Sequence, residues 1–450
     1  MLVLIVGIGK VGDILTEYIS KEGHNIVIID IDPKILETTI NKYDVLGILG
    51  SGTSHNILVE AGARKADLLI AVTTSDEMNI LCCLMAKCLG TKNIIARVRD
   101  PVYSQQRSFM SDELGLNMTI NPEYEAAYEM SRILRFPSAI KTDIFAKGRV
   151  ELAEIKLGED NPLNGHMLSE LSAILKARIL ICAVQRGNEV IIPSGNFKIE
   201  SGDYLYITAS HQELSNFFKS VGIYRERVRT VMIIGGSNIA YYLAELLDGL
   251  GMNVKLVEKE EQRCLELSDL LPNTKIIYGD GADRALLLEE GIENVDACVL
   301  LTSIDEENII LSMYAKKLGV RKVITKIDRT SFTDLLGSLD LESIISPKTV
   351  TSNNILRYIR AMNDTMGGSV QTLYKLVDGK IEALEFLVKN DKLITGIPLR
   401  DLKLKSNLLV ACLIRGNKII YPRGGDTIEP GDGLIIVTNH IIKDIDDILL

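Results

Sequence analysis

The stretch MLVLIVGIGKVG, residues 1–12, decides the fold of this chain. Six apolar residues run into glycines spaced G-x-G-x-x-G, at Gly7, Gly9 and Gly12, and a second apolar run follows at 26–29. This order predicts a strand, a glycine turn, a helix and a second strand. In such a unit Gly7 permits the tight turn, Gly9 lets the backbone approach a pyrophosphate, and Gly12 lets the helix pack closely on the strand.

The second apolar run ends on Asp30, which follows Gly12 by 18 residues (30 − 12). An acid about 20 residues beyond the glycines bonds a ribose 2′-hydroxyl and repels a 2′-phosphate. The pattern therefore favours NAD, or a related adenine nucleotide, over NADP. Its phosphates would meet the free N–H groups at the helix N-terminus. The alternative is that the glycines only form a tight turn between strand and helix.

The composition indicates a globular protein and excludes some function classes. At about 100–200 residues per domain, the 450 residues correspond to three or four domains. The net charge of −10 offers no basic face, so we expect no nucleic-acid partner. The seven cysteines include no CxxC pair, which argues against a disulfide framework or a zinc site and fits a reducing cytosol. No apolar run approaches the ~20 residues that span a bilayer, and residues 1–6 lack the basic flank of a signal peptide.

Apolar strand patterns and helical patterns alternate six times in the first 120 residues or so, which predicts a doubly wound parallel sheet. The later strands are expected at 44–49, 67–72, 94–98 and 116–120, with helices opening at Asp32-Pro33, Ser75, Asp100-Pro101 and Asn121-Pro122. Residues 150–208 differ, because apolar and acidic residues alternate at 150–155 and tight turns at 186–188 and 201–203 join short strands. With a short helix expected around 167–175, this part is predicted to be a small α+β domain.

The whole pattern then repeats with an offset of 228 residues, which becomes 229 from Gly50 onward. Gly235 and Glu258 are 23 residues apart, as are Gly7 and Asp30. The small domain recurs as well, since the R-G-N turn at 186–188 returns at 415–417. The chain is therefore a tandem duplication of a two-domain unit, with a first half and a second half. The predicted domains are 1–137, 138–225, 226–366 and 367–450.

This order of parts resembles the RCK domains that regulate potassium channels. Its length and duplication are similar to the peripheral subunit of bacterial and archaeal Trk potassium-uptake systems. The resemblance implies Rossmann-like N-lobes, α+β C-lobes and a homo-oligomeric ring of RCK lobes. It also implies a cytoplasmic, non-enzymatic regulatory subunit that is held at the inner face of the membrane by a membrane-embedded Trk-type potassium transporter. The first N-lobe would bind NAD(H), or ATP or ADP at the same site, and the ligand would gate the transporter.

The resemblance also places the nucleotide contacts, which fall at the carboxyl ends of successive predicted strands. In the first half they are Gly7, Ile8, Gly9, Lys10, Val11, Gly12, Asp30, Ser51, Thr73, Thr74 and Arg97. In the second half they are Gly235, Gly236, Ser237, Asn238, Ile239, Glu258, Asp280, Thr302, Ser303 and Lys326. The second half departs from the pattern, because Ser237 and Ala240 replace the second and third glycines. A side chain at Ser237 intrudes where a pyrophosphate approaches, so we expect the first half to bind dinucleotide more tightly.

Other residues that suggest chemistry have simpler explanations. Residues 73–77 have the composition of a helix start, and Cys82, Cys83 and Cys88 are expected to be small buried apolar groups. Glu123 and Glu125 suit a helix N-terminus, although a divalent-cation role is the alternative. The five histidines, at positions 24, 55, 166, 211 and 440, have no metal or triad spacing. We therefore predict no catalytic residue and no metal ligand.

Two alternative functions make different demands on the sequence. An NAD-dependent oxidoreductase needs an acid or base beside the nicotinamide, and the small domains offer only the isolated His166 and His211. A transcriptional redox sensor needs a helix-turn-helix and a basic face, and neither pattern is visible. The sequence thus favours a nucleotide-sensing regulatory subunit.

Overall fold

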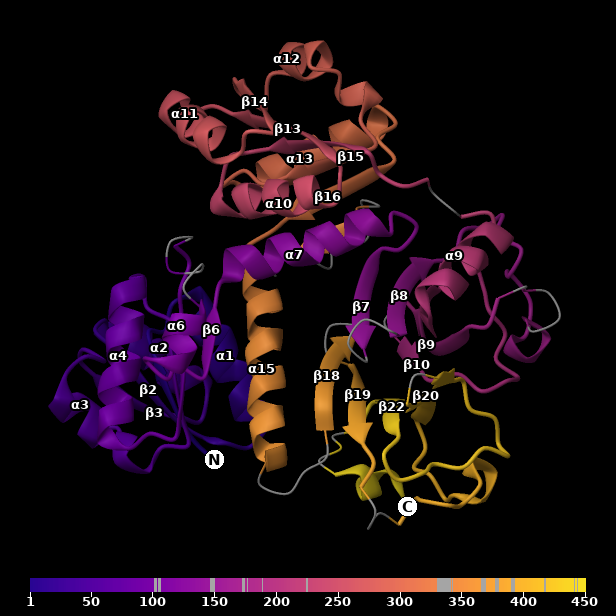
Figure 1. Ribbon diagram of the computed structural model, residues 1–450, viewed down its shortest axis with the longest axis horizontal. Helices are drawn as coiled ribbons and strands as arrows, with labels where there is room; N and C mark the ends of the chain where they lie inside the picture. The colour runs from indigo at the N-terminus through magenta and orange to yellow at the C-terminus, as the bar shows by residue number, and fades with distance from the viewer. Residues whose placement is uncertain are drawn as a thin grey trace. The chain divides into compact units, whose positions relative to one another are not determined.

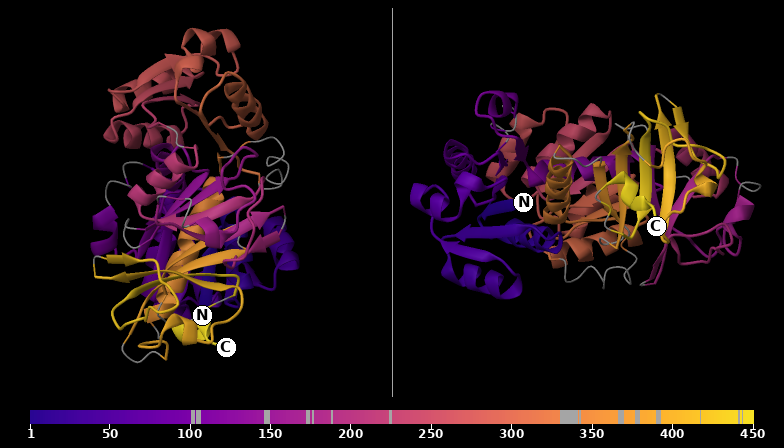
Figure 2. Two further views of the ribbon diagram at one scale, coloured as in Figure 1. Left: turned by 90° about the vertical axis from the view of Figure 1, so that its right-hand side faces the viewer. Right: turned by 90° about the horizontal axis from the view of Figure 1, so that it is seen from below.

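The contacts of the chain group into two units. Unit 1 combines Met1–Ser131 with Arg229–Leu356, and unit 2 combines Arg132–Val228 with Arg357–Leu450. Each unit therefore pairs corresponding parts of the two halves of the chain (Figures 1 and 2). The computed structural model describes residues 1–100, 103, 107–145, 150–171, 175, 177–187, 189–223, 226–329, 341, 343–365, 370–376, 380–389, 393–416, 418–440, 442 and 444–450. The predicted boundaries at 137, 225 and 366 stay predictions.

The first sheet of unit 1 is parallel and doubly wound, as predicted. Its strand order is β3-β2-β1-β4-β5-β6, so the order reverses between β1 and β4. Its strands are β1 (Leu2–Val6), β2 (Asn25–Asp30), β3 (Leu46–Leu49), β4 (Leu68–Ala71), β5 (Asn93–Arg97) and β6 (Met118–Ile120). Its helices are α1 (Lys10–Lys21), α2 (Pro33–Lys42), α3 (His55–Glu60), η1 (Ala63–Lys65), α4 (Asp76–Leu89), α6 (Arg107–Asp112) and α7 (Pro122–Arg135). Residues 3–6 and 68–71 are buried on both faces, which explains their unbroken apolar runs.

The second sheet of unit 1 repeats this topology, with the order β14-β13-β12-β15-β16-β17. Its strands are β12 (Thr230–Ile234), β13 (Asn253–Glu258), β14 (Lys275–Tyr278), β15 (Ala297–Leu300), β16 (Lys322–Lys326) and β17 (Ser343–Ile345). Its helices are α10 (Asn238–Gly249), α11 (Glu261–Leu270), α12 (Arg284–Glu289), η4 (Ile292–Asn294), α13 (Asp305–Lys317) and α15 (Pro347–Thr365). The predicted duplication is confirmed.

The duplication extends to individual hydrogen bonds. The fully buried Asn79 accepts from the Thr73 N–H at 2.7 Å and donates to the Arg97 carbonyl at 2.9 Å. Its counterpart Asn308 accepts from the Thr302 N–H at 2.9 Å and donates to the Lys326 carbonyl at 3.1 Å. In both sheets a buried amide thus joins the ends of two neighbouring strands.

Unit 2 holds two small antiparallel sheets with few helices, which confirms the predicted α+β domains. The first has the order β10-β9-β11-β8-β7, and the second has β18-β19-β22-β20-β21. The first comprises β7 (Lys141–Phe145), β8 (Val150–Lys156), η3 (Leu168–Glu170), β9 (Leu180–Arg186), β10 (Glu189–Ile191), β11 (Tyr204–Ala209) and α9 (His211–Ser220). The second comprises β18 (Val370–Leu376), β19 (Ile381–Leu387), η8 (Leu399–Asp401), β20 (Leu408–Arg415), β21 (Lys418–Ile420), β22 (Gly433–Thr438) and η9 (Ile445–Ile448).

Some expected local features differ or fall outside the described residues. Of the helix expected around 167–175, the described part is a 3-10 turn at η3 followed by a helical Leu171, and residues 172–174 lie outside the described range. Pro101 and the turn residues Asn188 and Asn417 also lie outside it. Asp32 and Ser75 cap α2 and α4 as predicted.

The two small sheets share one apolar core within unit 2. Val150 and Leu152 of β8 belong to the same buried cluster as Ile381 and Ala383 of β19. The other face of β8, which includes Ile155, packs in a separate core under α9. The apolar residues at 150–155 therefore serve two cores on opposite faces of one strand.

Candidate nucleotide-binding site

A cavity of about 650 Å³ lies at the carboxyl ends of β1, β2, β4 and β5, where the strand order reverses. This is the place where an open parallel sheet binds ligands, and the volume lies within the usual range for ligand pockets. We call it the unit 1 cavity. It is lined by Val6, Gly7, Gly9, Lys10, Val11, Ile29, Asp30, Ile31, Asp32, Ile35, Gly50, Ser51, Gly52, Val72, Thr73, Thr74, Ser75, Met78, Cys82, Arg97, Arg99, Pro122, Glu123, Asp328, Pro347 and Lys348.

Nearly all the residues predicted from the first half line this cavity. Those that do are Gly7, Gly9, Lys10, Val11, Asp30, Ser51, Thr73, Thr74 and Arg97. Ile8 and Gly12 do not. Ile8 is buried beneath the turn, and a Cβ at Gly12 would lie 2.2 Å from the Gly7 carbonyl oxygen, so α1 packs tightly on β1. Whether these residues contact a nucleotide stays a prediction.

The glycine turn leaves the start of α1 open. Gly7 has a φ of +89°, and a Cβ there would lie 2.8 Å from the Thr73 nitrogen, so this position requires glycine. Gly9 is the N-cap of α1 and gives it no side-chain hydrogen bond. Apart from Gly9 and its chain neighbours, no atom of the described residues lies within 4 Å of the place where a Gly9 Cβ would be. The first turn of α1 therefore has no side-chain cap of its own, and its N–H groups and positive dipole end suit an anion.

Asp30 is fixed at the tip of β2 by backbone donors. Its Oδ2 accepts from the Ile8 N–H at 2.6 Å, and its Oδ1 accepts from the Asp32 N–H at 2.9 Å. A carboxylate has about four acceptor positions, so two remain for hydroxyl donors such as those of a ribose. The apolar residues Ile31, Ile35 and Met78 line the same cavity.

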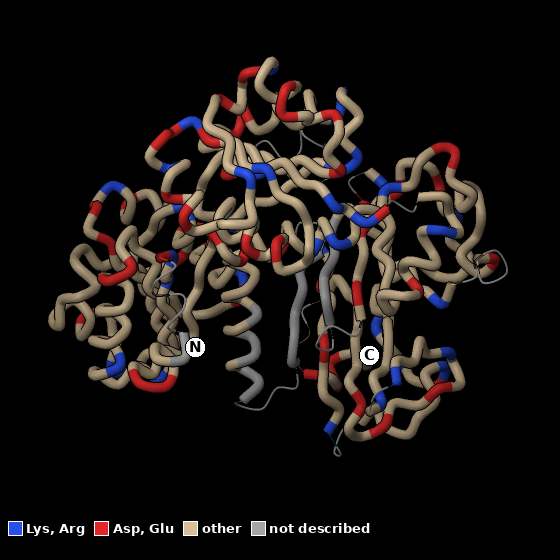
Figure 3. Tube along the Cα trace, turned by 45° about the horizontal axis from the view of Figure 1, so that its top comes forward, with Lys and Arg blue, Asp and Glu red and all other residues tan. Residues whose placement is uncertain are grey.

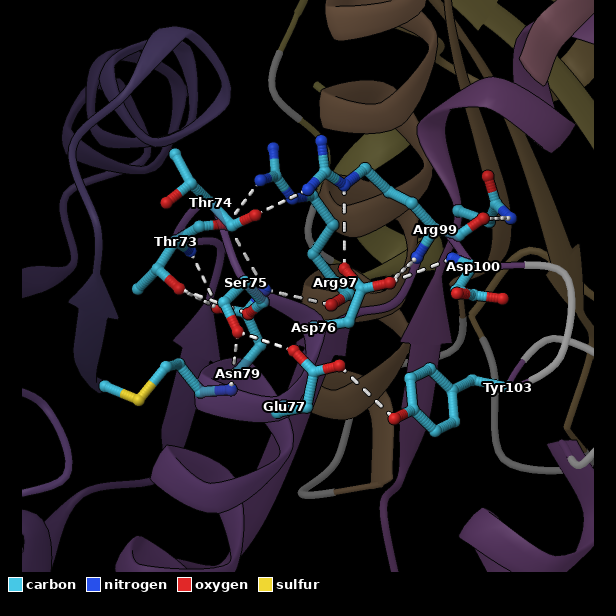
Figure 4. A network of polar contacts seen from close by, with 12 residues as sticks. Thr73, Thr74, Ser75, Asp76, Glu77, Asn79, Arg97, Arg99, Asp100 and Tyr103 are labelled. Carbon is cyan, nitrogen blue, oxygen red and sulfur yellow. Dashed lines mark hydrogen bonds and ion pairs between the residues drawn. The ribbon is translucent and has the colours of Figure 1, made fainter. Parts of the chain in front are cut away.

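Two arginines from the end of β5 point toward the loop after β4 (Figure 4). The Arg97 guanidinium donates to the Thr73 carbonyl, and that of Arg99 donates to the Thr74 carbonyl. Burial lowers the pKa of Arg97 from its usual value, and its Nε makes no hydrogen bond within the described residues. The sequence analysis predicted Arg97 but missed Arg99, although residues two apart in an extended segment point to the same side.

The loop between Thr73 and Glu77 is a helix start, as expected. Ser75 caps α4 by accepting from the Met78 N–H at 3.2 Å. The Asp76 carboxylate accepts from the backbone N–H groups of Arg99 and Asp100 at 2.7 and 2.8 Å (Figure 4). These polar groups serve to hold the loops after β4 and β5 together.

Residues from the second half complete the cavity inside unit 1. Asp328, Pro347 and Lys348 line it, and the Asp328 carboxylate lies 3.9 Å from the Lys10 ammonium and 3.2 Å from that of Lys326. Burial lowers the pKa of Lys348, and the Asp328 carboxylate opposes that shift. No sequence spacing indicated this contribution, because it depends on how the two large sheets pack.

Glu123 contributes a buried carboxyl group to the wall of the cavity. Burial raises the pKa of Glu123, while Arg99 and Arg97 act in the opposite direction. Its neighbour Glu125 accepts from the Asn354 amide at 2.7 Å. Within the described residues no group of three histidine, cysteine, aspartate or glutamate side chains is placed to hold a metal ion.

The second-half residues form a similar frame elsewhere in unit 1, and none of them lines the unit 1 cavity. The Gly236 N–H donates to Glu258 Oε2 at 2.6 Å, as Ile8 does to Asp30. Lys326 Nζ donates to the Thr302 carbonyl at 3.4 Å. The Arg97 guanidinium donates to the corresponding carbonyl, that of Thr73. Ile239 is buried and Ser303 is exposed, while Asp280 accepts from the Ala282 N–H at 2.9 Å. The remaining members, Gly235, Ser237 and Asn238, form the turn into α10.

The prediction that these cysteines are small buried apolar groups is confirmed for Cys82 and Cys83 and is wrong for Cys88, which lies on the exposed side of α4. Cys82 and Cys83 are fully buried, and burial raises the pKa of Cys82 to about 12 and that of Cys83 well above its usual value. Thiols in this state are unreactive apolar groups. Cys88 is exposed.

Comparison with known proteins gives consistent results along the whole chain. The TrkA-N domain family matches residues 3–122 and 231–347, and the TrkA-C domain family matches residues 152–222 and 383–443. The Trk system potassium uptake protein TrkA homolog 1 of Methanosarcina mazei is 33% identical over 447 residues, which is 97% of each chain. The Trk system potassium uptake protein TrkA of Haemophilus influenzae is 31% identical, over 97% of this chain and 95% of the relative.

Solved structures share the fold. The GsuK RCK domain matches 97% of this chain and 91% of its own with a TM-score of 0.63 and 17% identity. A GsuK channel structure bound to NAD matches 97% of this chain and 76% of its own, with a TM-score of 0.63 and 17% identity. No described helix of the present chain has the length and apolar character needed to cross a membrane.

Proposed function

The chain belongs to the TrkA family of Trk system potassium uptake proteins, and we propose that it is the nucleotide-sensing regulatory subunit of a potassium transporter. It works in the cytoplasm, as a ring of RCK lobes held at the inner face of the membrane by a membrane-embedded Trk-type transporter. It binds NAD(H), ATP or ADP in the unit 1 cavity. The observation that carries this proposal is a cavity that combines an uncapped helix N-terminus, a fixed acid and cationic side chains.

The two ends of the cavity suit the two ends of a nucleotide. The N–H groups of α1 and the cations Lys10, Arg97 and Arg99 would hold the phosphates. Asp30 would accept from the ribose hydroxyls, and Ile31, Ile35 and Met78 would flank the base. The proposed contacts are therefore the first-half residues predicted from the sequence, extended by Arg99.

Ligand binding would be coupled to the arrangement of the two large sheets. The cavity takes Asp328 and Lys348 from the second half, so a bound phosphate would contact both parts of unit 1. A ligand that binds two arrangements unequally shifts their balance by no more than its difference in affinity. Coupling of about 1–3 kcal/mol is typical and is enough for roughly 5–150-fold changes in the ratio of states.

The nucleotide acts as a signal and is not consumed. The alternative, an NAD-dependent oxidoreductase, would need a proton donor or acceptor beside the nicotinamide. In the cavity, the raised pKa of Glu123 would suit a proton donor, and the lowered pKa of Lys348 would suit a proton acceptor. Binding and turnover therefore have to be measured together.

Calorimetry with NAD, NADH, ADP and ATP on the full chain tests this proposal. We expect saturable binding, and we expect the absorbance of NADH to stay constant in the presence of protein and small alcohols, aldehydes or keto acids. Absence of binding by all four nucleotides would contradict the proposed function. Steady oxidation of NADH that is lost in a Glu123→Gln or Lys348→Met variant would support the oxidoreductase instead.

A further inference from the structure

The second large sheet repeats the frame of the nucleotide site. We compare the unit 1 cavity with the corresponding place in this sheet, at the turn into α10 beside Glu258, and call that place the second cleft. Glu258 is five residues before Arg263, as Asp30 is five residues before Ile35. Each acid accepts a backbone N–H from its glycine turn, from Gly236 or from Ile8, at 2.6 Å. The side chains of Arg263 and Ile35 therefore occupy corresponding positions on α11 and α2.

The Ile35 side chain leaves its cleft open, whereas the Arg263 side chain fills the corresponding place. Ile35 lines the unit 1 cavity and offers no polar group. Arg263 reaches back to its glycine turn, where its Nε donates to the Gly236 carbonyl at 2.8 Å and a terminal nitrogen donates to Asn238 Oδ1 at 3.1 Å. The other terminal nitrogen donates to Glu266 Oε2 at 3.0 Å, so each of the three guanidinium nitrogens makes a hydrogen bond. The guanidinium thus lies against Asn238, which corresponds to the cavity residue Lys10.

The start of α10 is also occupied by its own side chain. Ser237 is the N-cap, and its hydroxyl accepts from the Ala240 N–H at 3.4 Å. The corresponding cap of α1 is Gly9, which has no side chain and faces open space. A helix N-terminus that is capped internally has fewer N–H groups left for a phosphate.

The phosphate end of the second cleft also has less positive charge. The Asp76 carboxylate accepts from the Arg99 N–H, and the Asp305 carboxylate accepts from the Asp328 N–H, so Asp328 stands where the first sheet has Arg99. The Asp328 carboxylate lies 3.2 Å from Lys326, which is the counterpart of Arg97. The second cleft thus has one neutralised cation where the first has two arginines.

We infer that Arg263, together with Ser237, closes the second cleft, so that each chain binds a single adenine nucleotide, in the unit 1 cavity. This inference rests on the proposed function. The Arg263 side chain occupies the place that a ligand would take, and its hydrogen bonds connect α11 to the start of α10. The second large sheet then supplies Asp328 and Lys348 to the site of the first and has no nucleotide of its own.

Calorimetric stoichiometry with ADP on the full chain tests the inference. Wild type is expected to bind one ADP per chain, and Arg263→Ile/Ser237→Gly is expected to bind two, the second more weakly. Arg284→Ile is the control: the guanidinium carbon of this exposed residue lies 5.2 Å from the centroid of the Tyr314 ring, and this variant should keep one ADP per chain. Two ADP per wild-type chain, or one ADP in the opened variant, would overturn the inference.

A reciprocal exchange locates the binding sites. Gly9→Ser/Ile35→Arg places the closing residues in the first cleft, where the backbone of Gly9, at φ −73°, accepts serine without strain. This variant should bind no ADP, and adding Arg263→Ile/Ser237→Gly to it should restore one. Unchanged binding in Gly9→Ser/Ile35→Arg would contradict the assignment. If wild type binds no nucleotide at all, the proposed function fails, which is a different result from a stoichiometry of two.

Discussion

Asp30 has a structural task, and we propose a second one in binding, which comparison with Glu258 separates from the first. Each acid accepts one backbone N–H from its glycine turn, at 2.6 Å in both cases. Each also accepts the N–H two residues further on, at 2.9 Å for Asp30 and at 2.8 Å for Glu258. Only Asp30 lines the unit 1 cavity. The structural task is therefore common to both residues, whereas the proposed ribose contact belongs to Asp30 alone.

We predict that Asp30→Ala weakens NAD binding by about 1–3 kcal/mol, because it removes charge-assisted hydrogen bonds to the ribose. Asp30→Arg should raise the affinity for NADP relative to NAD. Glu258→Ala is the matched control, since it removes the same backbone bonds, and it should lower thermal stability without changing affinity. Calorimetry on all three variants checks this, and equal losses of affinity in the two alanine variants would place the ribose elsewhere.

Asp67 links the start of β1 to Lys92 beside β5. It accepts from the Leu2 N–H at 2.9 Å and pairs with the Lys92 ammonium at 2.7 Å. The Lys92 hydrogen bond lowers the pKa of Asp67 below its ordinary value of 3.8. A carboxylate whose pKa is lower in the folded than in the unfolded state stabilises the fold at pH values above its unfolded-state pKa. This stabilisation is lost as the pH falls through its folded-state pKa.

Asp67→Asn is therefore expected to lower the thermal midpoint at about pH 7, with the difference from wild type shrinking as the pH falls below about 4. Thermal scans of both proteins across this range measure it. A difference that grows toward acid pH would show that the sign of the shift is wrong.

At the scale of elements, local chemistry predicted much of the fold. The caps Asp32 and Ser75 have side chains that satisfy the first N–H groups of their helices, and such signals act within a few residues. The duplication added information, because each element was seen twice. Asp328 and Lys348 were missed because they reach the cavity only after two sheets pack together, whereas Arg99 follows β5 of the first sheet, two residues beyond Arg97. The burial of Glu151, whose pKa burial raises, likewise depends on its tertiary neighbours.

Arg186 and Arg415 of unit 2 form a repeated ion pair in which the carboxylate is buried and the arginine is partly exposed. Arg186 donates twice to the buried Asp203, at 2.8 Å each, and Arg415 donates to Asp432 at 2.9 and 2.8 Å. Each carboxylate also accepts a backbone N–H at 2.9 Å, from Glu200 and Glu429. Removing either arginine would leave a buried carboxylate without its cation.

Arg186→Met and Arg415→Met are each expected to cost roughly 3 kcal/mol of unfolding free energy. Arg400→Met is the control, because this exposed arginine lies 3.8 Å from an exposed Asp401 and such pairs contribute about 0–1 kcal/mol. Urea unfolding of the three variants gives the comparison. Similar midpoints for all three would mean that the repeated pair does not stabilise the turns.

At the scale of the whole molecule, the two halves of the chain interleave. Each unit takes one part from each half, and the small sheets share the core formed by Val150, Leu152, Ile381 and Ala383. Figure 3 shows basic and acidic residues interspersed along the described trace. Burial of shared apolar surface is therefore the expected link between them.

We predict that residues 1–225 and 226–450, expressed together as separate chains, associate and copurify, since each would otherwise expose the shared core of unit 2. Expressed alone, each fragment should aggregate or self-associate. Affinity purification through a tag on one fragment measures this. Two soluble, monomeric fragments that do not copurify would contradict the interleaved arrangement.

The most direct test of the regulatory role is potassium flux into proteoliposomes that hold the Trk-type transporter of the same organism with this chain bound. We predict that NADH, ATP or ADP changes the flux with wild type and with Glu258→Ala, that Asp30→Ala needs roughly 5–150-fold more nucleotide for the same response, and that NADH absorbance stays constant. A flux that is the same with and without every nucleotide, or an equal response in Asp30→Ala, would contradict it.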